Sequence, residues 1–542
     1  MSKRNSMDKP HDRSIARRRL LGASAAAALG AVVDAAPWAA GALRAASAQA
    51  ASATVFDARV TFDPGRASMP INRLVLGANV QWVDHGDELL SPGTLQLRPA
   101  MTSALQALGP TLLRYPGGTL SDNYRWARGT GSMQARGQGE HYWSRQKQVI
   151  EMGTPEVLEL CRVLGAEPLF TVNVVTGTAA EAAQWVTATN KTRFWSQTNG
   201  AQLPKVKYWE IGNEPYLKDD ARPDLWLAPA EFVRRAALFA KAMRAADPSI
   251  MIGVPGRSDT IGGIQLSPYK GFNDLLLPKV AADIDFIALH NAYLPFGVDR
   301  DYSDDEFYWG AMAASEVIAA DFVSTRAQLA RLAPGKNIRL AVTEYNAIFT
   351  LTMDRKKSDA YINSLAGAIY VADALRVFSS QPDLLAAVFH SLSGNWHFGL
   401  VSNRDVLRPA YFVLQGYSNL LRGKLVPLQI DTETFGSSRV GVVPDSARLP
   451  LVTGLGTLDQ KTARLVLINK DLKRSTHVAL TVTGMTRASD ASYVVLDGTN
   501  VFDTTDSDAK IARRRGTAKV SAGLLTLDLP PHSITFAEML VE

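Results

Sequence analysis

Short apolar runs alternate with amphipathic segments along most of this 542-residue chain. Between Leu74 and about Leu421, each apolar run is followed by a segment whose apolar residues recur near the helical period. Repeated strand-helix units of this kind predict a parallel sheet covered by helices. The runs that we interpret as strands are Leu74–Asn79, Thr111–Tyr115, Leu169–Val174, Lys207–Ile211, Met251–Val254, Phe286–His290, Leu340–Thr343 and Ala386–Leu392.

Eight strand-helix units predict a (β/α)8 TIM barrel with loop insertions, which we assign to residues 71–420. One insertion, Asp299–Met312, is rich in Asp, Tyr and Phe, and we expect it to be a loop at the rim of the barrel. The helical segments between the strands include Thr154–Leu164, Ala179–Thr189, Pro229–Ala245, Val317–Leu332 and Ser358–Ser379.

The pattern changes after about Leu421 to short alternating strands separated by Gly, Asp and Pro. Residues 421–542 therefore predict a C-terminal antiparallel β-sandwich (jelly-roll-like) domain. Its polar stretch Asp503–Lys519 is expected to be a mobile loop. Within residues 51–70, the run Thr54–Phe62 reads as a strand that joins this sandwich, since it otherwise has no sheet to pair with.

The first 50 residues have the composition of an export signal. A basic segment containing Arg17, Arg18 and Arg19 leads into an Ala-rich apolar run and then Ala48-Gln49-Ala50, which resembles a twin-arginine signal peptide with its cleavage site. A membrane anchor is the alternative, but Asp34 and Pro37 shorten the apolar run below the roughly 20 residues that a spanning helix needs. We predict a protein exported to the periplasm or secreted, without a stable membrane anchor after cleavage.

The net charge of +6 resides mainly in that leader. Residues 1–50 contain eight Lys or Arg and three Asp, a net charge of +5, so the remaining residues are nearly neutral. Because no basic stripe with interleaved aromatics remains, the sequence argues against nucleic-acid binding.

Two glutamates end predicted barrel strands. Glu214 follows the stretch Val206–Asn213, and Glu344 follows the apolar run from Leu340. The loops after the strand C-termini of a barrel converge on one mouth, where two carboxyls predict glycoside hydrolysis. An isolated Asn-Glu dipeptide is more typical of a surface turn. No metal or cofactor is predicted, because the chain lacks His-Glu-x-x-His and a His-x-His pair at the first strand end.

Other polar and aromatic residues follow the same predicted strands. Arg114 opens Arg-Tyr-Pro-Gly-Gly and can hold a carboxylate with paired donors, although a structural salt bridge is the alternative. The further candidates for contacts with a sugar are Asp122, Trp126, His290 and Trp396. Each of these four is also compatible with a side chain that only lies at the surface or only packs in the core.

Four segments together resemble the retaining glycoside hydrolases of clan A. They are Arg114–Gly118, Asn173–Thr178, Ile211–Pro215 and Thr343–Asn346. Within the clan the chain is most similar to family 51, the α-L-arabinofuranosidases, from about residue 55 to the C-terminus. The resemblance implies an oligo- or polysaccharide substrate and adds Asn173 to the candidate site residues.

The resemblance also implies roles for single residues. Glu214 corresponds to the acid/base and Glu344 to the nucleophile, Asn213 to the ligand of the sugar 2-hydroxyl, and Arg114 and Tyr293 to partners of the nucleophile. The implied mechanism is double displacement with retention.

The chain departs from the family at several of these positions. The family's glutamate after the first strand has no clear equivalent, and Asn79 or Gln81 is the candidate replacement. The nucleophile strand reads Thr343-Glu344-Tyr345-Asn346 where the family usually has Asp-Glu-Trp-Asn. The alternatives are another clan A glycosidase, namely a β-xylosidase, β-glucuronidase or endo-β-glucanase, and a non-catalytic carbohydrate-binding protein.

Overall fold

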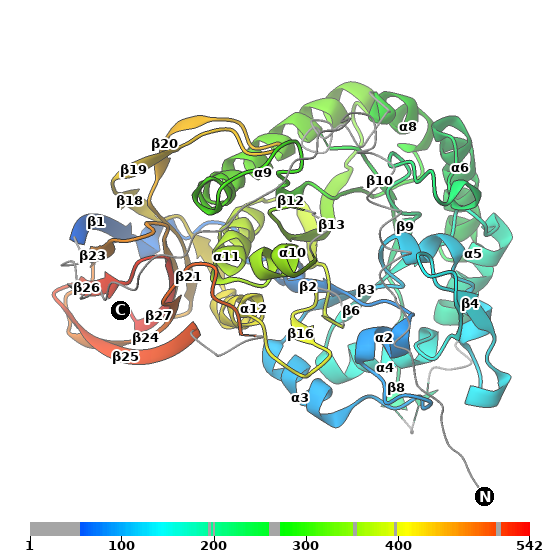
Figure 1. Ribbon diagram of the computed structural model, residues 1–542, viewed down its shortest axis with the longest axis horizontal. Helices are drawn as coiled ribbons and strands as arrows, with labels where there is room; N and C mark the ends of the chain where they lie inside the picture. Colours follow the sequence, from blue (N-terminus) through cyan, green and yellow to red (C-terminus); the bar gives the residue numbers. More distant parts are fainter. Residues whose placement is uncertain are drawn as a thin grey trace, which may run out of the picture.

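The computed structural model describes residues 55–192, 197–198, 201–258, 271–350, 355–394, 398–505 and 511–541. The predicted export signal and Trp396 lie outside these described residues. The described chain forms two parts that lie side by side, a helix-covered barrel and a domain made of strands (Figure 1).

Eight parallel strands close into the barrel. Their order around the ring is β2, β3, β6, β9, β10, β11, β13 and β14, and pairing of β11 with β13 and of β14 with β2 completes the circle. The predicted TIM barrel is therefore confirmed. Their bounds are β2 Gly77–Asn79, β3 Leu112–Tyr115, β6 Glu167–Val172, β9 Tyr208–Ile211, β10 Met251–Pro255, β11 Phe286–Leu289, β13 Arg339–Ile348 and β14 Leu384–Phe389.

These strands are apolar because they are covered on both sides, by helices outside and by packed side chains inside. Leu112, Leu169, Tyr208 and Phe286 come from four different strands and belong to one buried cluster. The helices, which Figure 1 shows around the strands, are α2 Asp84–Glu88, α3 Pro99–Leu108, α4 Thr154–Leu164, α5 Ala179–Thr187, α6 Pro229–Ala246, α8 Phe272–Val280, α9 Asp304–Leu332, α10 Arg355–Ile362, α11 Leu365–Ser379 and α12 Pro409–Leu420.

The predicted rim loop Asp299–Met312 is wrong from Asp304 onward, because helix α9 begins there. Ser303 caps the helix by accepting a hydrogen bond from the Glu306 backbone N–H at 3.2 Å, while the Glu306 carboxylate accepts from the Ser303 N–H at 2.9 Å. This reciprocal capping box satisfies backbone donors of the first turn. The aromatic side chain of Phe307 is buried against the core.

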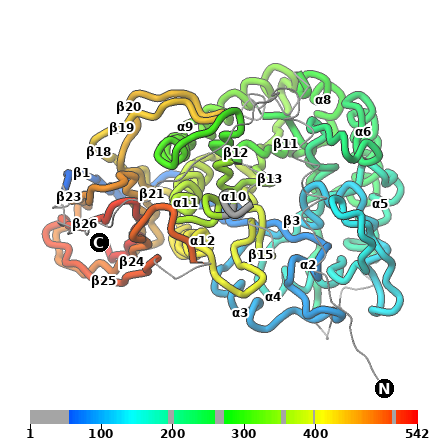
Figure 2. Tube along the Cα trace, viewed as in Figure 1, coloured from blue at the N-terminus to red at the C-terminus, as the bar shows by residue number. Residues whose placement is uncertain are grey.

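The second part is one mostly antiparallel sheet of ten strands, in the order β17, β21, β22, β27, β24, β25, β26, β23, β1, β18. Strand β1 comes from the start of the described chain and pairs in parallel with β23, and the two tubes run together in Figure 2. The bounds are β1 Val55–Phe62, β17 Lys424–Val426, β18 Gln429–Asp431, β21 Val452–Asp459, β22 Thr462–Asn469, β23 Ser475–Val482, β24 Ser489–Gly498, β25 Ile511–Ser521, β26 Leu524–Leu529 and β27 Ser533–Leu540.

The predicted mobile loop Asp503–Lys519 is wrong from Ile511 onward, because β25 begins there and pairs with β24 along its length. The short strands outside the two main sheets are β4 Gln138–Glu140, β5 Lys147–Val149, β7 Gln197–Thr198, β8 Ala201–Gln202, β15 Ser393–Gly394, β16 Val401–Ser402, β19 Thr434–Ser437 and β20 Ser446–Pro450, and β12 Ala292–Pro295 adds to the barrel sheet beside β13.

A buried ion pair joins the two parts. The ammonium of Lys470, after β22, lies 2.7 Å from the Asp373 carboxylate on α11. Asp373 also accepts hydrogen bonds from Arg376 at 2.6 Å and from Thr453 at 2.9 Å. Burial would raise the pKa of Asp373, but Arg376 and Lys470 outweigh it and lower that pKa below its ordinary value. The β domain is thus attached to the barrel by charge as well as by packing.

Candidate active site

The polar cluster at the C-terminal ends of the barrel strands is built from six strands. This is the end at which TIM barrels carry their active sites. The members are Asn79 of β2, Arg114 of β3, Glu210 and Glu214 on and after β9, His290 after β11, Glu344 of β13 and His390 after β14, with Tyr293 on the adjoining β12.

Arg114 is the centre of the cluster and is fully buried. Its Nε donates to Glu210 Oε2 at 2.6 Å, and its Nη1 donates to Glu344 Oε1 at 2.7 Å and to Asn79 Oδ1 at 3.0 Å. Its Nη2 donates to Asn213 Oδ1 at 2.9 Å. Burial alone would lower the pKa of Arg114, but the two carboxylates reverse this and raise it. The guanidinium therefore stays charged and fixes one carboxylate on each side.

Glu344 is held by three donors and is only 4% exposed. Besides Arg114, the Tyr293 hydroxyl donates to Oε2 at 2.7 Å, and His390 Nδ1 lies 3.0 Å from the same oxygen. Burial would raise the pKa of Glu344, but His290, His390 and Arg114 together lower it well below its ordinary value of 4.5. Glu344 is therefore a carboxylate across the neutral range, as a nucleophile requires.

The two glycines of Arg-Tyr-Pro-Gly-Gly let the backbone pass close to these side chains. Gly117 and Gly118 have φ of +61° and +58°, a region that residues with a Cβ rarely adopt. A Cβ on Gly118 would lie 3.3 Å from Glu344 Oε1. The motif thus combines the arginine that holds the carboxylate with a turn that leaves room for it.

Glu214 sits in a turn after β9, with a φ of +38°, and its side chain is 20% exposed. His290 Nδ1 lies 2.8 Å from its Oε1, and the opposite ring nitrogen, Nε2, lies 3.1 Å from Thr343 Oγ1. The Thr343 hydroxyl donates to Glu210 Oε1 at 2.9 Å, so its oxygen accepts from His290 Nε2–H. One further proton is then shared between His290 Nδ1 and Glu214.

Charge in the site supports that protonation. Burial would lower the pKa of His290, but Glu344 and Glu214 outweigh it and raise that pKa above 6.5. The same Nδ1 atom lies 3.8 Å from Glu344 Oε2. The imidazole therefore lies between the two carboxyls and keeps a proton beside Glu214.

Three of the other predicted residues lie in or near this cluster. Asn213 is buried, and because Arg114 occupies its Oδ1, its amide nitrogen is the group left to donate to a ligand. Asn79 is fully buried, and its Nδ2 donates to the Thr343 carbonyl at 3.1 Å. This bond fixes the side chain whose Oδ1 accepts from Arg114. Asp122 is 5% exposed, and burial together with the nearby Glu214 raises its pKa well above the ordinary value.

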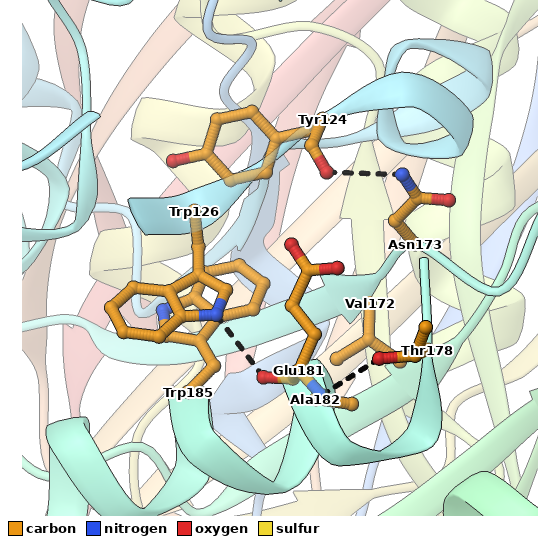
Figure 3. Close-up of a pocket in the computed structure, with 8 residues that line it drawn as sticks. All are labelled: Tyr124, Trp126, Val172, Asn173, Thr178, Glu181, Ala182 and Trp185. Atoms are coloured by element: carbon orange, nitrogen blue, oxygen red, sulfur yellow. Dashed lines mark hydrogen bonds between the residues drawn. The ribbon is translucent and has the colours of Figure 1, made fainter. Parts of the chain in front are cut away.

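Asn173 and Trp126 lie in a separate recess between β6, α5 and the loop after β3 (Figure 3). Asn173 Nδ2 donates to the Tyr124 carbonyl at 3.1 Å, and its Oδ1 accepts from the Thr176 and Gly177 backbone at 2.8 and 3.1 Å. Trp126 Nε1 donates to the Glu181 carbonyl at 3.1 Å. Both side chains are therefore hydrogen-bonded to these loops or to the start of α5.

Three residues of the cluster were not predicted as site residues: Glu210, Thr343 and His390. Glu210 is a charged residue inside an otherwise apolar strand, and His390 lies at the end of the eighth predicted strand. Both are signals that a search of every strand end and every charged strand residue would have found. Among the described residues, no group of three or more His, Cys, Asp or Glu side chains is arranged to hold a metal ion.

Comparisons with known proteins indicate the family to which the chain belongs. Residues 104–263 match the model of the α-L-arabinofuranosidase 1 domain, and residues 343–533 match that of the α-L-arabinofuranosidase C-terminal domain. The intracellular exo-α-L-arabinofuranosidase of Bacteroides ovatus is 24% identical over 84% of this chain and 89% of that protein. A probable α-L-arabinofuranosidase C of Aspergillus terreus is 26% identical over 62% of this chain and 68% of its own.

The fold is shared with solved structures. The α-L-arabinofuranosidase of Thermotoga maritima, solved as an arabinose complex, superposes with a TM-score of 0.76 at 20% identity, over 90% of this chain and 100% of that one. The chain is thus a glycoside hydrolase built on a TIM barrel with an accompanying β domain. Within that class it is arabinofuranosidase-like, most similar to the family 51 α-L-arabinofuranosidases of clan A.

Proposed function

We propose that this protein hydrolyses terminal α-L-arabinofuranosyl bonds of plant-type oligo- or polysaccharides, with retention at the anomeric carbon. Glu344 is the nucleophile and Glu214 the general acid/base. The sugar assignment rests on the two α-L-arabinofuranosidase models and on the names of the relatives.

In the first half-reaction, Glu344 attacks the anomeric carbon while Glu214 gives its proton to the leaving oxygen. The proton comes from the pair that Glu214 forms with His290, at 2.8 Å. Asn213, whose Oδ1 is held by Arg114, directs its amide nitrogen toward a sugar hydroxyl. The products are the free aglycone and a glycosyl ester of Glu344.

In the second half-reaction, Glu214 acts as a base and takes a proton from water as the water attacks the same carbon. The bond between the sugar and Glu344 breaks, and its electron pair returns to the carboxylate. Arg114 and Tyr293 donate to that carboxylate and favour its release.

The separation of the two carboxyls carries the proposal. His290 Nδ1 lies 2.8 Å from Glu214 Oε1 and 3.8 Å from Glu344 Oε2. Those two oxygens are therefore at most about 6.6 Å apart, a limit that includes the roughly 5–5.5 Å of retaining enzymes and only the lower end of the inverting range, about 6.5–9.5 Å.

The test uses Glu344→Ala and Glu214→Ala, with Glu231→Ala on the exposed side of α6 as a matched control. On 4-nitrophenyl α-L-arabinofuranoside we expect Glu344→Ala to lose at least about 10⁴-fold in kcat, within the rate enhancement that glycosidases supply. Proton NMR of the first product should show the substrate's anomeric configuration. Near-normal activity of Glu344→Ala, or a product of opposite configuration, would refute the mechanism.

A second candidate is another clan A glycosidase, a β-xylosidase, β-glucuronidase or endo-β-glucanase. It is favoured by the changed nucleophile strand and by the presence of His390, with Gln81 beside it, at the nucleophile. A panel of aryl glycosides and plant polysaccharides separates the two, since Glu344→Ala and Glu214→Ala should lose whichever activity the wild type has and Glu231→Ala should keep it.

We also propose that the protein is exported through its N-terminal 50 residues, supported by Arg17-Arg18-Arg19 and the apolar run that follows. In the described part of the chain, no helix has the length and hydropathy to cross a membrane. Export predicts a mature N-terminus near residue 50 in the extracellular or periplasmic fraction, lost when Arg17 and Arg18 are changed to Lys.

A further inference from the structure

His390 contacts the carboxylate that carries the sugar in the proposed mechanism. Its Nδ1 lies 3.0 Å from Glu344 Oε2 and 2.9 Å from the Tyr293 hydroxyl. On the other side of the ring, Nε2 lies 3.4 Å from Gln81 Nε2. The side chain is 14% exposed, so these partners rather than water occupy its ring nitrogens.

The partners determine where the imidazole carries its proton. Gln81 Nε2 is a donor, so His390 Nε2 accepts from it. In the neutral ring Nδ1 then carries the hydrogen and donates toward Glu344 Oε2. A ring with its lone pair on Nδ1 would instead face a carboxylate oxygen at 3.0 Å, which is repulsive.

Gln81 is itself fixed. It is 6% exposed, and its backbone N–H donates to the carboxyl of Asp87. Asp87 is buried and its backbone carbonyl accepts from Ser393 at 2.8 Å. The loop after β2 is therefore anchored behind the imidazole, and Gln81 holds one orientation of the ring.

The oxygen that His390 contacts is the one that faces the acid/base. His290 Nδ1 is 2.8 Å from Glu214, and its nearest Glu344 oxygen is Oε2, at 3.8 Å. A sugar held between the two carboxyls meets Oε2. His390 therefore donates to the oxygen whose bond to the sugar forms and breaks.

We propose that His390 is a positioning residue that acts through Glu344: its Nδ1–H, oriented by Gln81, stabilises the carboxylate as it leaves the glycosyl-enzyme. This inference rests on the proposed function. In the ester, Oε2 has lost a lone pair to the anomeric carbon, and Nδ1–H turns to the Tyr293 oxygen at 2.9 Å. As the sugar–Oε2 bond breaks, the electron pair returns to Oε2, water adds to the carbon, and the water's proton passes to Glu214.

The donor has opposite effects on the two half-reactions. It weakens Glu344 as a nucleophile in the free enzyme and improves it as a leaving group in the intermediate. Removing it should slow deglycosylation and let the intermediate accumulate. Because KM depends on both steps, kcat and KM should then fall together, while kcat/KM changes little.

The experiment compares His390→Ala, His390→Asn and Gln81→Met on an activated dinitrophenyl glycoside of the sugar that the wild type cleaves. For His390→Ala we expect kcat to fall about 10- to 100-fold, the range of one hydrogen bond to a charged group, with KM lower by a similar factor and a burst of dinitrophenol. His390→Asn places an amide donor near Nδ1 and should recover part of kcat. Gln81→Met should show the same pattern at a few-fold.

Two results overturn the inference without touching the proposed function. One is a His390→Ala enzyme that loses kcat/KM as much as kcat, with unchanged KM and no burst. The other is a His390→Asn enzyme that behaves like His390→Ala although both fold, as judged by thermal melting. If Glu344→Ala itself remains active, the proposed function fails instead.

Discussion

Glu210 offers a test of how the buried cluster controls the acid/base. This carboxylate lies inside β9, is fully buried, and accepts from three donors: Arg114 at 2.6 Å, Thr343 at 2.9 Å and Thr171 at 3.0 Å. The Thr343 hydroxyl donates its hydrogen to Glu210, so the Thr343 oxygen accepts from His290 Nε2–H. A second proton then lies between His290 Nδ1 and Glu214. The informative change is Glu210→Gln, which keeps the shape and removes the charge.

The amide would reverse this chain of hydrogen bonds. Its oxygen can still accept from Arg114 and Thr171, but its nitrogen then donates to Thr343, whose hydroxyl turns to His290 Nε2. The imidazole loses its partner for Nε2–H, so the pKa of His290, which is raised in the wild type, should fall. The cost is that of about one hydrogen bond to a charged group, roughly 1.5–3 kcal/mol, or about 1–2 pKa units.

The assay is the pH dependence of kcat/KM together with thermal unfolding. A raised His290 pKa keeps the shared proton in place to above pH 6.5, so the alkaline limb of the wild type should lie above that value. For Glu210→Gln the limb should move to lower pH by about 1–2 units, and unfolding should cost about 3–5 kcal/mol less because a buried ion pair is broken.

Thr171→Val is the matched control, because it removes a donor to Glu210 Oε2, the oxygen that Arg114 also contacts. It changes neither the charge of Glu210 nor the contact between Thr343 and His290. It should lower stability by about 1 kcal/mol and leave the alkaline limb in place. An unchanged limb in Glu210→Gln, with stability lowered, would mean that Glu210 only supports Arg114 and that the hydrogen-bond chain does not control the proton.

Two further predictions concern the domain junction and the glycine turn. Asp373→Asn should lower the unfolding free energy by about 3–5 kcal/mol, because it leaves the buried Lys470 ammonium beside Arg376 without a carboxylate. Lys470→Met should lower it less, because Asp373 keeps its ion pair with Arg376. Calorimetry that finds Lys470→Met the less stable of the two would contradict this. Gly118→Ala should lower kcat/KM at least about 10-fold, because the alanine would have to adopt a φ of +58° and its Cβ would lie 3.3 Å from Glu344 Oε1. A variant with a normal rate and a normal melting temperature would contradict this.

The barrel was predictable because parallel strands covered on both faces must be apolar. β9 is an example, with Tyr208, Trp209 and Ile211 all buried. The sequence predicted loops wrongly where a helix or a strand carries many charged residues on its exposed side. Arg513 to Arg515 read as a polar loop, yet they lie on β25, where Arg514 pairs with Asp497 of β24. The helix start at Ser303 had a readable signal, the capping box with Glu306.

Only the part of the site that follows from the positions of the strand ends could be predicted. Glu214 and Glu344 could be placed at one mouth from topology alone. Which groups contact them depends on side-chain directions set by tertiary packing. His390 contacts Glu344 across 46 residues, and His290 contacts Glu214 across 76. Nothing in the local pattern around either histidine distinguishes a partner of a carboxylate from a structural residue.

Arg114 explains why catalysis and folding are difficult to separate in this barrel. Its five donors in a rigid fork reach residues of β2, β9 and β13 and the turn after β9, which no Lys ammonium with three donors could do. His290, His390 and Arg114 lower the pKa of Glu344, and the bonds of Arg114 also hold the strand ends together. Changes of sugar specificity are therefore expected in side chains outside this network, such as Gln81, because replacing it alters the sugar's surroundings without leaving a buried charge unpaired.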